Sequence, residues 1–243
     1  MQTNRQEAKE IIILSPTPNE YRSVSAHVGR ASFRRLNCSV VECGPGRICA
    51  SYVAAGELAA RRVEKDGAVM LVGAGTSGSL SLELKSGDVI VSDSAVISDW
   101  RMEEGEKETV SPYGWFDYRE PDPAHVEKMV IRGQDARVRA VLSELPAKGF
   151  KLGRMLTSEA FICGREHKLN LGRRFGCLAC DMESGAFAFI GNRLAKVPWF
   201  NIRVVADDLD EALNDYFAME KDVTEILGQK VVEVLEVLDK SFE

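Results

Sequence analysis

The sequence has few of the residues that metal sites and nucleic-acid-binding surfaces need. Its 243 residues include only 3 histidines, and His27, His125 and His167 are too scattered for a zinc site. Lys and Arg total 31 against 37 Asp and Glu, which gives a net charge of −6 and no excess of basic residues to bind phosphates. We therefore expect no metal, no organic cofactor and no nucleic-acid partner.

Long hydrophobic runs are also missing. No apolar stretch approaches the roughly 20 residues that cross a membrane. The first ten residues, MQTNRQEAKE, are polar and lack the apolar segment of a secretory signal. We expect a cytoplasmic protein without a membrane partner. In that compartment the 6 cysteines stay reduced, so the pair Cys177 and Cys180 is interpreted as two ordinary thiols.

The hydrophobic content of 45% is enough for a large core, and we expect one α/β domain spanning residues 1–243. Apolar runs predict strands that alternate with helical patterns, and several of these strands are apolar on both faces. Such strands are typical of a mostly parallel central sheet covered by helices on both sides. Strands are predicted within 10–18, 35–47, 68–80, 87–96, 150–161 and 197–208, and helices within 20–30, 48–67, 123–145 and 223–240. Asn19 is the expected N-cap of the first helix.

A glycine-rich stretch, GAGTSG, covers Gly73 to Gly78 after the third predicted strand. It formally matches a dinucleotide fingerprint, but that motif follows the first strand and opens a helix. Two other interpretations stay open. The stretch is a tight turn that needs glycine backbone freedom, or a backbone surface that lies close to the polar atoms of a ligand.

Acidic residues stand at both ends of one predicted helix–strand unit. Asp181 and Glu183 precede the helix, and Asp207 and Asp208 end the strand that follows. Ligands of open α/β sheets bind beyond the carboxyl ends of the strands. Solvation explains acids at one end, whereas a site between the two ends explains both.

Several motifs taken together resemble those of the nucleoside phosphorylase/nucleosidase superfamily. They are CGPGR, VGAGTSGSL, SGDVIVSDSAV, TSEAFI, CDMESGAFA and VPWFNIRVVADD, and the similarity runs from about Ile11 to Leu238. Within the superfamily the chain is most similar to the 5′-methylthioadenosine/S-adenosylhomocysteine nucleosidases. The resemblance implies a three-layer α/β/α sandwich around a twisted mixed sheet. It also implies cleavage of the N-glycosidic bond of a purine nucleoside.

The resemblance implies roles for individual residues. Glu183 looks like the glutamate that holds the ribose hydroxyls, and Met182 like the residue under the sugar. Asp207 looks like the acid that protonates N7 of the purine. Glu20 looks like the residue that orients the attacking water.

Other positions are similar to binding positions of the family. The implied contacts are Thr76 and Arg203 near the water, Gly75 in the glycine stretch, Phe161 over the base, Ile162 at the hydrogen-bonding edge of the base, and Tyr113 and Trp115 near the 5′ substituent.

The chemistry of glycosidic cleavage needs these residue types. A purine leaves as a neutral base only if an acid protonates it, and burial at a strand end raises the pKa of a carboxyl so that it can do so. The sugar becomes an oxocarbenium-like cation that a nearby carboxylate stabilises. A second carboxylate across the ring orients water, which is the logic of inverting glycoside hydrolysis.

Two questions stay open at the sequence level. Phosphorylases that resemble this chain carry an arginine where it has Gly73, which favours water over phosphate as the nucleophile, although other arginines could bind phosphate. The segment 99–118 is longer and more acidic than in the family, so deoxyfutalosine-type nucleosides are alternative substrates. The resemblance and the aromatic residues of this segment suggest a homodimer or a higher homo-oligomer.

Overall fold

The computed structural model describes residues 9–61, 69–99, 101–104, 107–110, 123–207, 209 and 213–242. Tyr113, Trp115 and Asp208 lie outside these residues, so the predictions about them stay predictions. Within the described part, no helix is long and apolar enough to cross a membrane.

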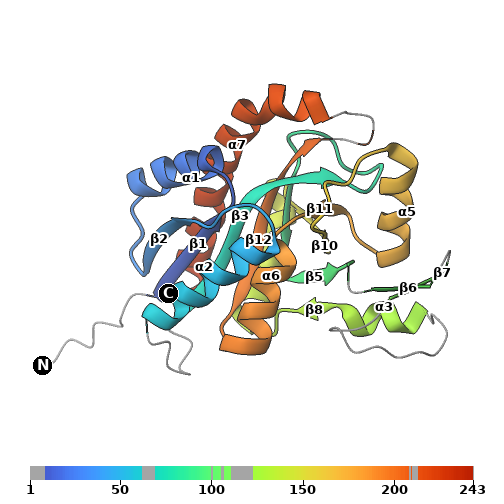
Figure 1. Ribbon diagram of the computed structural model, residues 1–243. Helices are drawn as coiled ribbons and strands as arrows, with labels where there is room; N and C mark the ends of the chain where they lie inside the picture. Colours follow the sequence, from blue (N-terminus) through green and yellow to red (C-terminus); the bar gives the residue numbers. More distant parts are fainter. Residues whose placement is uncertain are drawn as a thin grey trace, which may run out of the picture.

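A twisted mixed sheet forms the centre of the molecule (Figure 1). Its strands are β1 (Lys9–Ser15), β2 (Leu36–Glu42), β3 (Val69–Ser79), β4 (Val89–Ser92), β5 (Ser94–Ile97), β8 (Ile131–Arg132), β9 (Lys151–Leu152), β10 (Met155–Thr157), β11 (Ala179–Asp181) and β12 (Trp199–Asp207). The order along the main path is β8-β5-β10-β11-β3-β12-β4-β9, and β1 joins β3 to β2. A separate hairpin pairs β6 (Arg101–Glu104) with β7 (Lys107–Val110).

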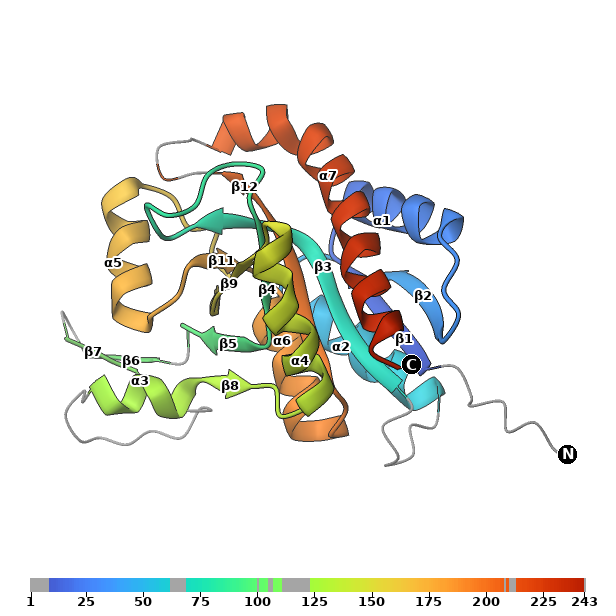
Figure 2. The ribbon, with the colours of Figure 1, turned by 180° about the vertical axis from the view of Figure 1, so that it is seen from behind.

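Helices cover both faces of the sheet (Figures 1 and 2). One face carries α1 (Pro18–Arg30), α4 (Ala136–Glu144) with the short turn η2 (Leu145–Lys148), and α7 (Leu213–Lys240). The opposite face carries α2 (Arg47–Ala60) and α6 (Ser184–Phe189), which continues into the wider turns of η3 (Ile190–Ala195). The remaining helices, α3 (Pro123–Met129) and α5 (Arg165–Phe175), lie beside the β8–β5–β10–β11 part. The predicted three-layer α/β/α sandwich is confirmed.

The long central strand β3 explains why both faces need a cover. Met70, Val72 and Ala74 point into the core beneath α1 and α7, whereas Val69 and Leu71 point into the core beneath α2 and α6. All residues of β3 are buried, as expected for a strand with side chains packed on both sides. Its first half pairs with β1 and its end pairs with β11, so β3 links the two halves of the sheet.

Three local predictions were wrong. Thr17, and not Asn19, caps α1, because its hydroxyl accepts a hydrogen bond from the amide of Glu20 while Pro18 occupies the first helical turn. The segment 123–145 is not one helix but α3 and α4, separated by β8. The stretch GAGTSG does not form a tight turn after the third strand but belongs to the end of β3, and none of its glycines has positive φ.

Candidate functional site

The carboxyl ends of the strands enclose a pocket with an interior volume of about 190 Å³. The walls come from the β1–α1 turn, the loop before α2, the end of β3, the segment after β10, β11 with the start of α6, and the end of β12. The lining residues are Pro16, Thr17, Glu20, Pro45, Thr76, Ser77, Gly78, Ala160, Phe161, Ile162, Cys180, Asp181, Met182, Glu183 and Asp207.

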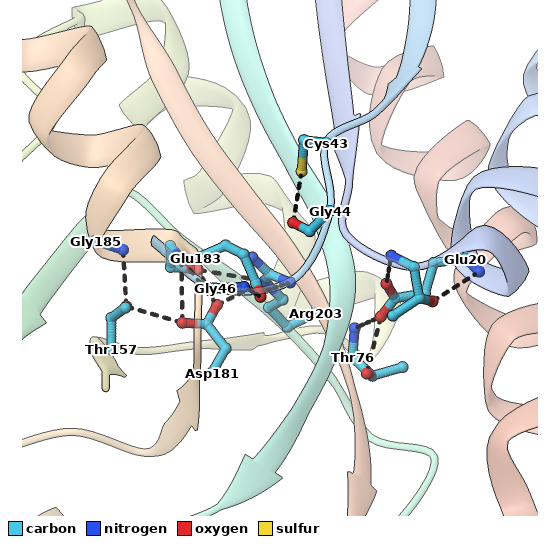
Figure 3. A network of polar contacts seen from close by, with 12 residues as sticks. Glu20, Cys43, Gly44, Gly46, Thr76, Thr157, Asp181, Glu183, Gly185 and Arg203 are labelled. Carbon is cyan, nitrogen blue, oxygen red and sulfur yellow. Dashed lines mark hydrogen bonds and ion pairs between the residues drawn. The ribbon is translucent and has the colours of Figure 1, made fainter. Parts of the chain in front are cut away.

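Glu20 is fixed by its place in the first turn of α1. Its Oε2 accepts a hydrogen bond from the amide of Thr17 at 2.8 Å, which completes a capping box. Its Oε1 accepts two more, from the amide of Thr76 at 2.6 Å and from the Thr76 hydroxyl at 2.9 Å (Figure 3). Both carboxylate oxygens are therefore occupied by donors. Glu20 is only 2% exposed, so the side chain is held rigidly at the wall of the pocket.

Glu183 lies on the other side of the site and bridges two segments. Its Oε1 accepts a hydrogen bond from the amide of Gly46 at 2.8 Å, and its Oε2 lies 3.4 Å from Nη1 of Arg203. The CGPGR motif therefore contributes a backbone donor from the loop before α2. Gly46 has φ +84°, a conformation that favours glycine, so the motif needs glycine at this position.

Asp181 organises the region behind Glu183 (Figure 3). Its carboxylate pairs with Nε of Arg203 at 2.8 Å and accepts a hydrogen bond from the Thr157 hydroxyl at 2.8 Å. It also accepts hydrogen bonds from the amide and the hydroxyl of Ser184 at the start of α6. The Thr157 hydroxyl in turn accepts a hydrogen bond from the amide of Gly185 at 2.7 Å. This network fixes the turn that carries Met182 and Glu183.

Burial and charge act against each other in this cluster. Burial raises the pKa of Glu183 to about 8, although the nearby guanidinium of Arg203 lowers it. Burial alone would lower the pKa of Arg203, but the carboxylates of Asp181, Glu183 and Glu20 outweigh it and raise that pKa. The thiol of Cys43 is close to the same charges, and burial, aided by Glu183, raises its pKa to about 12. The site therefore holds a buried cation, Arg203, behind Glu183, whose carboxyl group is costly to ionise.

The glycines of β3 make room for polar side chains of the neighbouring strand β12. The two strands pair in parallel, with Gly73 opposite Asn201, Gly75 opposite Arg203 and Gly78 opposite Asp207. A Cβ at Gly73 would lie 2.2 Å from Oδ1 of Asn201, and one at Gly75 would lie 2.2 Å from Nη1 of Arg203. At Gly78 it would lie 2.7 Å from Oδ1 of Asp207. The glycine pattern therefore reflects close side-chain approach rather than a tight turn.

Asp207 ends β12 at the pocket wall, and its side chain forms a buried ion pair. Nζ of Lys168 lies 2.5 Å from its Oδ2. The side chain of Lys168 is fully buried and that of Asp207 is 6% exposed. Lys168 belongs to α5, which follows directly after the segment that carries Phe161 and Ile162. One segment thus supplies two pocket residues and the partner of Asp207.

The structure brings together most of the residues that the sequence singled out. Glu20, Thr76, Met182, Glu183, Phe161, Ile162 and Asp207 all line the pocket. Gly75 and Arg203 lie behind its wall, where Arg203 is fully buried. Phe161 is 43% exposed at the mouth, consistent with a position that can cover a ligand.

Sequence reasoning missed three contributors to the site. Asp181 was noted as an acid without a function of its own, and Gly46 was recognised only as part of the motif CGPGR, without a contact to Glu183. Lys168 carried no signal, because a lysine in the first half of a polar helix is normally exposed. The close approach of β3 and β12 could have been suspected from three glycines that face three polar residues.

The chain belongs to the phosphorylase superfamily, whose family model matches residues 5–239. Two curated relatives, the 5′-methylthioadenosine/S-adenosylhomocysteine nucleosidases of Mycobacterium bovis and Mycobacterium tuberculosis, are each 28% identical over 159 residues. That alignment covers 59% of this chain and 61% of the length of each relative.

Solved structures share the fold over nearly the whole chain. The Helicobacter pylori 5′-methylthioadenosine/S-adenosylhomocysteine nucleosidase, solved with a nucleoside-analogue ligand, has a TM-score of 0.75 at 17% identity, covering 95% of this chain and 99% of that one. The futalosine hydrolase of the same organism has a TM-score of 0.73 at 18% identity, covering 96% and 98%. At these identities the likeness concerns the fold.

Proposed function

We propose that the protein is a nucleosidase that hydrolyses the N-glycosidic bond of a 5′-substituted adenine nucleoside, of the methylthioadenosine or S-adenosylhomocysteine type. The observation that carries this proposal is the placement of three buried carboxyl groups, from Glu20, Glu183 and Asp207, on separate walls of one pocket. Cleavage of the bond needs an acid for the base, a carboxylate for the sugar and a carboxylate for water.

The roles follow from the surroundings of each group. Asp207 would donate a proton to N7, so that the purine leaves as a neutral base. Glu183 would bind the ribose hydroxyls, and its ionised form would become more favourable as positive charge develops on the sugar. Glu20 already accepts donors at both oxygens, which suits an ionised group that orients a water molecule beside Thr76.

The remaining lining residues suit the apolar parts of a nucleoside. Met182 would lie under the sugar, and Phe161 would stack on the base at the mouth of the pocket. The backbone of Ile162 would offer hydrogen bonds to the edge of the base. These assignments match the apolar walls with few polar groups that small-molecule pockets usually have.

Two features support water rather than phosphate as the nucleophile. None of the described residues that line the pocket is an arginine or a lysine, whereas phosphate binding calls for such cations. The phosphorylase arginine would stand at Gly73, where even a Cβ would collide with Asn201 and Phe187. Arg203 is nearby, and its Nε and Nη1 are paired with Asp181 and Glu183, which leaves only its buried Nη2 without a hydrogen-bond partner. A phosphorylase of the same fold is therefore the weaker alternative.

We also propose that the protein acts as a homo-oligomer through α2. Ile48 and Tyr52 stand one turn apart on this helix and are 80% and 82% exposed. Large apolar side chains that lie together on a surface often mark an interface. The same helix begins at the loop whose Gly46 amide binds Glu183, so an interface on α2 would also stabilise the site.

A nucleoside panel in phosphate-free buffer tests the proposal. Methylthioadenosine, S-adenosylhomocysteine, aminodeoxyfutalosine, adenosine and inosine are incubated with the protein, and the released base is measured. We expect adenine from the first two substrates, and a loss of about 10²-fold or more in Asp207→Asn. A preference for aminodeoxyfutalosine would identify a futalosine-type hydrolase. Release of no base from any member would contradict the assignment.

A further inference from the structure

Lys168 has no role in the reaction described so far, although its ammonium group lies 2.5 Å from the carboxylate of Asp207. A fully buried lysine is rare and costly, because the charge loses its hydration. A methionine would fill a similar volume without that cost. The presence of a charge at this position therefore calls for a function in the pair itself.

The ion pair creates a difficulty for the proposed acid. An ammonium group in contact with a carboxylate favours its ionised form, but an acid must carry a proton before it can donate one. The difficulty disappears if the two groups are treated as one unit. Nζ of Lys168 donates a hydrogen bond of 2.5 Å to Oδ2 of Asp207, so a proton can pass from one group to the other along this contact.

We propose that Lys168 is a positioning residue that holds Asp207 in place and stores the proton that Asp207 delivers to the purine. The inference rests on the proposed function and adds to it a source for the proton. Lys168 itself does not touch the substrate, because it is absent from the residues that line the pocket and acts through Asp207.

The proton balance of the step is complete. At rest the proton lies on Lys168, and Asp207 is ionised. As the glycosidic bond breaks, its electron pair moves into the purine and N7 becomes basic. Asp207 then accepts a proton from Lys168 and passes one to N7, which leaves a neutral amine and a carboxylate. Water forms the new bond to the sugar carbon and gives its proton to Glu20. After the base has left, Glu20 releases that proton to solvent and Lys168 regains one from solvent.

The surroundings of the pair suit this function. Gly78 leaves room for Asp207 on one side, since a Cβ there would lie 2.7 Å from its Oδ1, so the carboxylate can occupy the position in which it pairs with Lys168. Cys180 of β11 is affected by both charges, and burial raises the pKa of its thiol, which keeps it neutral. Asp181 and Cys177 also act on Cys180, and Asp181 is already paired with Arg203.

The pH dependence of kcat/KM in Lys168→Met tests the proposal. Without the stored proton, Asp207 can act only at a pH where it is itself protonated. We expect activity within about tenfold of wild type at pH 5.5 and a loss of about 10²-fold at pH 8, expressed in kcat rather than KM. We compare the two proteins by the ratio of their kcat/KM values at each pH. Because both proteins contain Glu183, any effect of its protonation on activity cancels in this ratio. Lys148→Met, which changes an exposed lysine, is the matched control and should leave the profile unchanged.

Lys168→Arg separates proton storage from simple charge pairing. Arginine keeps the positive charge but does not release its proton, so Asp207 would stay ionised without a supply. We expect this variant to be less active than Lys168→Met at pH 5.5. Profiles parallel to wild type in both variants, or activity restored by arginine, would show that Lys168 only fills and neutralises the site.

A second measurement needs no turnover. The carboxyl carbon of Asp207 can be followed by NMR in protein labelled at aspartate, with Asp207→Asn to assign the signal. In Lys168→Met this carboxyl should take up its proton at a pH about one unit or more above that in wild type. An unchanged titration would overturn the proposal. If the wild type cleaved no nucleoside, the proposed function would fail while this result would still report on the pair.

Discussion

At the scale of single residues, Glu183 combines two opposing demands. The proposed function requires a partly desolvated carboxylate to bind the ribose, and desolvation favours the neutral acid. The Gly46 amide and the guanidinium of Arg203 oppose this effect, yet burial still raises the pKa to about 8. Burial therefore makes the ionised form of Glu183 unfavourable at neutral pH, and a ligand that carries positive charge would stabilise that form.

The raised pKa of Glu183 predicts a pH-dependent difference in stability between wild type and Glu183→Gln. The pKa of Glu183 in the folded protein lies above its ordinary value of 4.5, so the folded state holds a proton that the unfolded state has lost between about pH 4.5 and pH 8. Wild type should lose stability as pH rises through this window, by at most about 1.4 kcal/mol for each pH unit. The glutamine variant has no carboxyl group to take up this proton, so it should not lose stability in this way.

Urea unfolding of both proteins at pH 5, 6, 7 and 8 measures the difference. The free energy of unfolding of Glu183→Gln, relative to wild type, should rise steadily with pH. Glu144→Gln, which changes an exposed glutamate at the end of α4, should show a constant difference. A constant difference for Glu183→Gln as well would mean that Glu183 is ionised throughout the range in the folded protein.

At the scale of elements, the pairing of β3 with β12 shows how far sequence patterns reach. The glycine stretch and the run that ends in Asp207 were both recognised as parts of the site. The sequence did not show that the glycines leave room for the side chains of the second segment. A glycine that leaves such room looks the same in sequence as one that makes a turn. Only the register, with Gly75 opposite Arg203, distinguishes the two.

The helix α2 is the element on which the oligomer prediction depends. Replacing both Ile48 and Tyr52 by lysine would place charges at the centre of the proposed interface, where an unpaired charge opposes association. We expect the variant to shift from oligomer to monomer in light scattering coupled to gel filtration. Base release should fall as well, because α2 begins at the loop that binds Glu183.

Leu82→Lys provides the control for this shift. Leu82 is 67% exposed and lies in the turn after β3, away from α2, so its replacement should leave the oligomeric state unchanged. A double variant that keeps the size of wild type would rule out α2 as the interface. A wild type that is monomeric at micromolar concentration would contradict the oligomer proposal itself.

At the scale of the whole molecule, the alternation of apolar strands and helices was sufficient to predict the layers. The position of the pocket followed from the rule that ligands bind at the carboxyl ends of strands, and Glu20, Glu183 and Asp207 all meet there. The ion pair of Lys168 with Asp207 could not be predicted from the sequence, because it joins residues from different elements and depends on complete burial of one of them.

In the proposed reaction water, and not phosphate, attacks the sugar in this pocket. The sugar product formed in the presence of radiolabelled inorganic phosphate tests it most directly, with the preferred nucleoside of the panel as substrate. Attack by water predicts free pentose, no label in the sugar fraction and a rate independent of phosphate. A labelled sugar 1-phosphate, formed at a rate that rises with phosphate concentration, would contradict the account and make the protein a phosphorylase.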